Sequence, residues 1–176
     1  MKLYLFLGLF CVMALEGTAQ KHVAEKSVIT FFSQAPMEDI SATNSKTASI
    51  LNVQTGELVF SVPIREFQFE KKLMQEHFNE KYMESDKYPK ATFSGKLIDL
   101  DPTQASEQAV KAKGKLTIHE VTKDVELDGT AQLGDKIVLK SKFSVKLTDY
   151  KIKIPQLLFK NIAEEIEVTV DITYKP

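Results

Sequence analysis

The feature that most constrains the fold is an alternation of apolar and polar residues, which recurs eight times after residue 20. Successive side chains of a β-strand point to opposite faces, so a period of two is typical of strands with one buried and one solvated face. The pattern is cleanest over residues 110–118, where lysine or threonine separates small and apolar residues. The eight predicted strands are residues 28–33, 47–53, 57–65, 91–98, 110–118, 121–127, 137–147 and 166–174.

One segment has a different period and predicts a helix. In residues 70–85, Leu73, Phe78 and Tyr82, together with Met74, lie near one face at helical spacing. We expect Pro89 to end this helix, because proline lacks an amide donor and forces the preceding residue into extended geometry. Gly134-Asp135 predicts a tight hairpin turn.

Eight strands joined mostly by short turns, with one helix between the third and fourth, predict an all-β protein: an eight-stranded antiparallel barrel. A β-sandwich is the alternative. The chain of 176 residues is too short for a TIM barrel or a two-domain Rossmann enzyme. An eight-stranded barrel is just wide enough to be filled by its own side chains or to hold one small ligand, and sequence patterns do not distinguish these cases.

The first 19 residues predict a cleaved secretory signal peptide. Lys2 precedes an apolar run over residues 3–15, and Gly17-Thr18-Ala19 offers small residues before a cleavage site at Gln20. An uncleaved anchor helix is the alternative, although the run is shorter than the roughly 20 residues that span a bilayer. We therefore expect a domain of residues 20–176 that is periplasmic or secreted. It contains no cysteine, because Cys11 lies in the leader.

Charge and residue spacing argue against several classes of function. The net charge of −1 gives no excess of positive charge with which to bind nucleic acid. The three histidines, His22, His77 and His119, have no metal-ligand spacing, and we expect them in surface or capping positions. Glu164-Glu165 and the pair Asp99 and Asp101 lie beside strands or turns, where solvated carboxylates are ordinary. We therefore predict no enzyme activity, no metal and no cofactor.

Four groups of residues, in order along the chain, resemble motifs of the YceI family of secreted, lipocalin-like polyisoprenoid-binding proteins. The most specific is GKLTIHEVTK at residues 114–123, which is similar to a hairpin of the form GxLxIHGVTK in that family. The others are residues 27–40, residues 67–93 with MESDKYPKATF, and the pair DYKIKIP and IAEEI in residues 149–166. One departure is visible, because Glu120 occupies the turn position that is usually glycine.

The resemblance implies a barrel around an apolar tunnel that binds a polyisoprenoid, an isoprenoid quinone or a fatty acid or amide. The residues expected to line it, with Phe67, Phe69 and Phe78 near a helix that covers one opening, are Phe32, Leu58, Phe60, Phe67, Phe69, Phe78, Phe93, Leu116, Ile118, Phe143, Val168 and Val170. The alternative is a filled barrel that acts as a secreted interaction or stress-related module through its outer surface. Whether two copies form a homodimer is left open.

Overall fold

The computed structural model describes residues 20–34, 38–154 and 162–175. The expected signal peptide, residues 1–19, lies outside the described residues. Among the residues that are described, no helix has both the length and the apolar character needed to cross a membrane.

Eight strands pair into a closed ring in the order β1-β3-β4-β6-β7-β8-β9-β10, and the ring closes because β10 also pairs with β1. Every pairing is antiparallel. The predicted barrel is therefore confirmed, and the alternative of a sandwich is wrong. The strands of the ring are β1 (Lys21–Ser33), β3 (Ala48–Asn52), β4 (Glu57–Pro63), β6 (Lys90–Ile98), β7 (Gln108–Ile118), β8 (Val121–Leu133), β9 (Ile137–Lys146) and β10 (Glu165–Tyr174).

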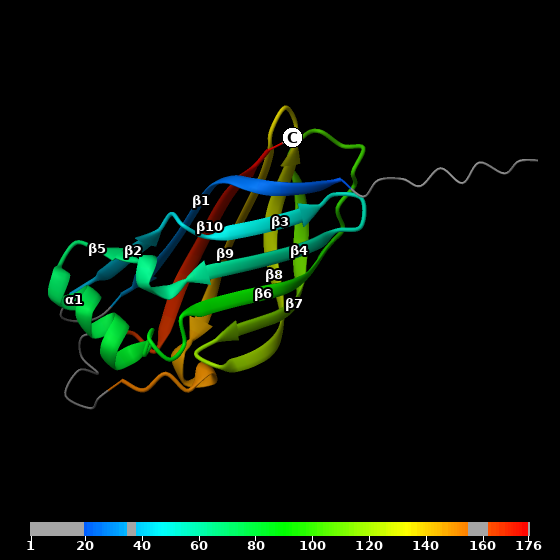
Figure 1. Cartoon of the computed structure of the whole chain (residues 1–176). Coiled ribbons are helices and arrows are strands. Elements are labelled where there is room, and N and C mark those ends of the chain that lie inside the picture. Colours follow the sequence, from blue (N-terminus) through cyan, green and yellow to red (C-terminus); the bar gives the residue numbers. More distant parts are fainter. Residues whose placement is uncertain (1–19, 35–37, 155–161, 176) are drawn as a thin grey trace, which may run out of the picture.

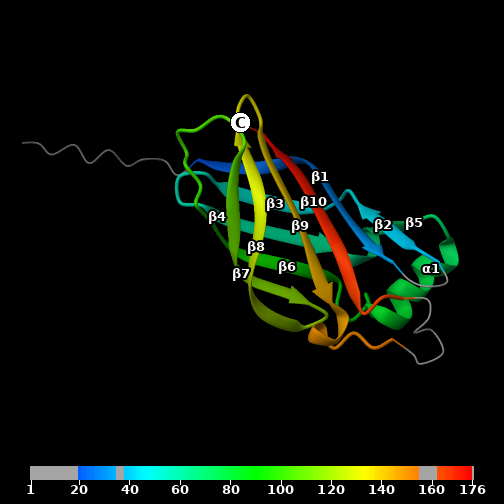
Figure 2. The same ribbon diagram turned by 180° about the vertical axis from the view of Figure 1, so that it is seen from behind.

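Two short strands outside the ring were not predicted. The strand β2 (Ile40–Asn44) pairs with the second half of β1, and β5 (Gln68–Phe69) pairs with β2. They extend the sheet at the end of the barrel where the helix α1 (Lys72–His77) lies (Figure 1). Seen from behind, β7 to β10 form the opposite wall (Figure 2). The barrel therefore has one end with a helix and one without.

The predicted helix is confirmed in place but differs in length. After α1 the chain continues as one π-helical turn, η2 (Phe78–Tyr82), in which the amide of Met83 donates to the carbonyl of Phe78 at 2.9 Å. The helix ends there, well before Pro89, because Glu84 adopts a left-handed conformation with φ 43°. The expected role of Pro89 as the terminator is wrong.

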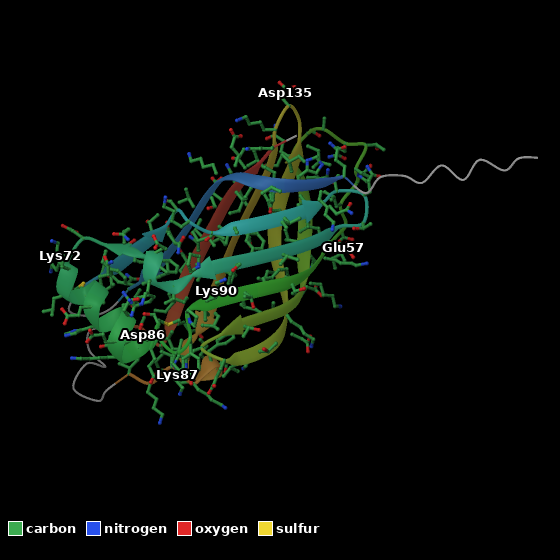
Figure 3. The ribbon with its side chains drawn as sticks, in the orientation of Figure 1. Glu57, Lys72, Asp86, Lys87, Lys90 and Asp135 are labelled. Carbon is green, nitrogen blue, oxygen red and sulfur yellow. The ribbon has the colours of Figure 1, made fainter. Side chains whose placement is uncertain are left out.

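The end of the barrel away from α1 is filled by side chains. Six buried residues on five strands, which we call the packed end, pack together there: Leu51, Leu58, Ala131, Ile137, Ile172 and Tyr174. Glu57 and Asp135 mark this end of the molecule, and Lys72 marks the opposite end (Figure 3). The hydroxyl of Tyr174 lies 2.7 Å from Ser49 Oγ, so its one polar atom is satisfied.

On the outer face of β7 and β8, residues of opposite charge lie directly opposite each other. Lys113 lies opposite Glu126 and Lys115 opposite Asp124 in the strand pairing. Lys115 Nζ is 2.9 Å from an Asp124 carboxylate oxygen, and both side chains are well exposed. Exposed pairs of this kind contribute little to stability, but opposite charges on facing residues favour this register over its alternatives.

The hairpin between β7 and β8 is closed by the two residues His119 and Glu120. Both have positive φ, 47° and 64°, as a type I′ turn requires. Glycine adopts this conformation without the steric cost that a Cβ imposes. Glu120 therefore leaves strain in a turn whose form the structure otherwise keeps.

We predict that Glu120→Gly raises the free energy of unfolding by about 1 kcal/mol, because relief of the left-handed strain exceeds the entropy that glycine adds to the unfolded chain. Thermal unfolding should shift up by about 2–4 °C. Glu120→Ala is the matched control, since it removes the carboxylate and keeps the Cβ. Equal stabilisation by both variants would assign the effect to charge and contradict this explanation.

We predict that the burial of Tyr174 causes a specific loss of stability at high pH. Burial raises the pKa of Tyr174 far above its ordinary value of about 10. The unfolded chain releases this proton as the pH rises through about 10 while the folded chain keeps it, so stability is present below that pH and falls above it. Between pH 8 and pH 11, urea unfolding should show a larger loss for the natural protein than for Tyr174→Phe. Equal losses would contradict this assignment.

Candidate ligand-binding cavity

The half of the barrel nearer α1 is hollow. It encloses a cavity of about 330 Å³, within the range of small-molecule sites, and its lining is almost entirely apolar. The walls come from strands of the ring, and four residues of the helical segment contribute to the lining: Met74, His77, Phe78 and Tyr82. The helix therefore covers one end of a cavity whose other end is the packed end.

Ten of the twelve residues expected to line a tunnel border this cavity. They are Phe60, Phe67, Phe69, Phe78, Phe93, Leu116, Ile118, Phe143, Val168 and Val170. Their contact with a ligand remains a prediction. For those on strands, the alternating pattern could predict an inward position, because every second residue of a strand points to the same face.

Phe32 and Leu58 do not border the cavity, for different reasons. On β1 the lining residues are Ile29, Phe31 and Ser33, so alternation places Phe32 on the outer face. Leu58 shares the inner face of β4 with Phe60, but it is 1% exposed and belongs to the packed end. The face of β1 was misjudged because Phe31 and Phe32 are both apolar.

Four phenylalanines form an aromatic cluster at the helix end of the cavity: Phe31, Phe67, Phe69 and Phe78. The ring of Phe31 lies 5.3, 5.6 and 5.5 Å from the rings of Phe67, Phe69 and Phe78 respectively. Phe69 and Phe78 are 5.0 Å apart. Aromatic pairs at such distances contribute about 0.5–1.5 kcal/mol each beyond the area that they bury. This cluster connects η2 to β1 and β5, and its rings also face the cavity.

The helical face toward the cavity differs from the predicted one at two positions. Met74, Phe78 and Tyr82 border the cavity as their spacing suggested, but Leu73 is 62% exposed. His77 also borders the cavity and was missed, because polar residues give no signal in an apolar pattern. Residues 77 and 78 are three and four positions after 74, so helical spacing places all three on the same side, and that spacing is the one available clue.

Polar groups in the lining are few, and two of them come from the helical segment. His77 is on the last turn of α1 and Tyr82 ends η2. The phenol of Tyr82 is protonated at neutral pH and can donate a hydrogen bond, and burial raises its pKa further. These two side chains could orient a polar head group at this end.

Three other polar residues at the cavity, Ser33, Ser141 and Lys140, have partners elsewhere. Ser33 Oγ accepts a hydrogen bond from the amide of Ala163 at 2.9 Å. Ser141 Oγ donates to the carbonyl of Asp128 at 2.6 Å. Lys140 Nζ lies 4.0 Å from an Asp171 carboxylate oxygen at the surface. None of the described residues that border the cavity is Asp or Glu. The wall thus offers an apolar occupant few competing polar groups.

Two histidines occupy buried positions, contrary to the expected surface or capping roles. His119 is 9% exposed, and its Nε2 lies 3.1 Å from Glu84 Oε2 while its ring packs edge-on against Tyr88 at 4.4 Å. His22 Nδ1 donates to the carbonyl of Lys175 at 2.9 Å. Within the described residues, no group of three or more potential ligands could hold a metal ion. His119 instead joins the β7–β8 hairpin to the segment after η2.

The fold and the cavity together define a β-barrel with room for one apolar small molecule. The chain belongs to the YceI-like domain family, whose model matches residues 21–174. None of the curated proteins matches the sequence.

Solved structures with this fold include several at low sequence identity. BcnA of Burkholderia cenocepacia has a TM-score of 0.71 at 16% identity, over 84% of this chain and 95% of that one. A polyisoprenoid-binding domain from Saccharophagus degradans, implicated in plant cell wall breakdown, has a TM-score of 0.75 at 13% identity, over 88% and 97%. The YceI protein of Campylobacter jejuni has a TM-score of 0.58 at 16% identity, over 100% and 99%.

Proposed function

We propose that the protein binds a long-chain apolar molecule inside the barrel and sequesters or carries it without making or breaking a covalent bond. The apolar cavity of about 330 Å³ is the observation that carries this proposal. Each Å² of apolar surface moved from water into the cavity contributes about 25 cal/mol. The filled-barrel alternative has no comparable support, because side chains fill only one end of the interior.

The class of ligand is an isoprenoid, an isoprenoid quinone or a fatty acid or amide. The apolar walls suit a hydrocarbon tail, and His77 and Tyr82 suit a hydroxyl or carbonyl head. The polyisoprenoid-binding domain of S. degradans, which has the same fold, supports this class. A secreted or periplasmic location, which the leader suggests, fits a carrier because such tails are poorly soluble in water.

A binding role without catalysis accounts best for the side chains around the cavity. Acid–base catalysis needs a titratable group placed against the reacting atoms, most often a histidine and otherwise commonly a carboxylate. Among the described cavity-lining residues there is one histidine, His77, and no Asp or Glu that could pair with it. Of the described lining residues, Tyr82 has a shifted pKa, and burial raises that pKa further above neutrality, which disfavours the phenolate that could act as a base.

We predict that Phe60→Asp abolishes uptake of a fluorescent fatty-acid probe, because a carboxylate in the cavity must lose its hydration whenever an apolar tail binds. Val59→Asp is the matched control. Val59 is the neighbouring residue on β4 and is 46% exposed on the outer face, so this variant adds the same charge outside the barrel. Retained uptake by folded Phe60→Asp would reject the cavity as the site.

A second pair of variants avoids a buried charge. Val168→Phe adds volume to the cavity wall, whereas Thr169→Phe adds the same ring on the exposed face of β10. We expect probe affinity to fall at least tenfold for Val168→Phe and to stay within twofold for Thr169→Phe. Circular dichroism confirms folding in each case. Equal affinities for two folded variants would contradict binding inside the barrel.

A further inference from the structure

The interior of the barrel is divided into a hollow half and a filled half. Residues of β10 show the division along a single strand, because Ile166, Val168 and Val170 border the cavity, while Ile172 and Tyr174 are fully buried in the packed end. The same division occurs on β4 between Phe60 and Leu58. The cavity therefore stops partway along the barrel and does not continue as an open tunnel to the far end.

Five residues border the cavity and are also buried members of the cluster that includes the packed end: Phe60, Phe93, Leu97, Val110 and Leu139. The three aliphatic ones, Leu97 on β6, Val110 on β7 and Leu139 on β9, form what we call the boundary. Their exposed fractions are 5%, 3% and 4%. Beneath them, the hydrogen bond between Tyr174 and Ser49 ties β10 to β3. The boundary is thus a packed floor that a flexible tail would have to displace.

We propose that this floor limits the length of the ligand tail inside the barrel, with Leu97, Val110 and Leu139 as the residues that determine that length. The proposal rests on the proposed function and specifies it further. A tail longer than the hollow half extends past the helix end.

The dependence of affinity on chain length reports the position of the floor. While the tail still fits, each added methylene strengthens binding about fourfold, equivalent to about 0.8 kcal/mol. Once the tail reaches the floor, a further methylene stays outside the cavity and contributes much less. Primary n-alkanols from eight to eighteen carbons are suitable probes, because their head group is constant and uncharged.

The experiment measures displacement of a fluorescent fatty-acid probe by this alkanol series. For the natural protein, affinity should rise with chain length and then level off within the series. Leu97→Ala removes three carbons from the floor and should move that point about three carbons longer. Val110→Phe adds four and should move it shorter by a similar number. Leu73→Ala is the matched control, because Leu73 is exposed on α1 and lies outside the cavity lining.

The outcomes separate this proposal from the function on which it rests. If no alkanol displaces the probe and the probe itself does not bind, the proposed function fails. If alkanols bind but affinity rises steadily to eighteen carbons, or levels off at one length in all folded variants, the floor proposal alone is overturned. Because the two variants change the length in opposite directions, Val110→Phe still tests the proposal if Leu97→Ala does not fold.

Discussion

The pairing of β1 with β10 is the interaction on which the rest of the structure depends. The two strands exchange backbone hydrogen bonds over most of their length, from Ala24 opposite Tyr174 to Phe32 opposite Glu167. Without that pairing the sheet would have two free edges and no enclosed interior. With it, every inward residue of eight strands faces a shared space, and eight strands leave a space that is narrow enough to fill or to hold one ligand.

The choice of side chains decides which part of that space is filled. At the packed end, aliphatic residues such as Leu51 and Ile172 fill the barrel together with Tyr174, whose hydroxyl is bonded to Ser49. At the helix end, the rings of Phe67, Phe69 and Phe78 pack against one another at the wall, and the centre stays open. One barrel thus combines a core that stabilises the fold with a cavity that is available for binding.

The parts of the fold with a simple period could be predicted from the sequence. Alternation identified all eight strands of the ring, and helical spacing identified the segment that contains α1. The inner face could be assigned where polar residues alternate with apolar ones, as around Leu116 and Ile118. The inner face was misassigned at Phe31 and Phe32, since two adjacent apolar residues do not indicate which of them points inward.

Other features depend on contacts between distant residues and have no local signal. The inward position of Leu58 was predictable, but its place beneath the cavity depends on Leu51 and Tyr174 from other strands. The burial of His119 against Glu84 joins residues 35 positions apart. The end of the helix at Glu84 follows from a backbone conformation that a glutamate rarely adopts, so the more familiar stop signal at Pro89 was preferred.

The most direct test of the account is the content of the barrel in the protein as cells make it. The protein would be purified after secretion and extracted with organic solvent, and the extract would be analysed by mass spectrometry for lipid. Enclosure of an apolar ligand predicts about one tail-bearing molecule per protein, released on unfolding. An empty extract, together with no uptake of added isoprenoids or fatty amides, would contradict the carrier function and direct attention to the outer surface.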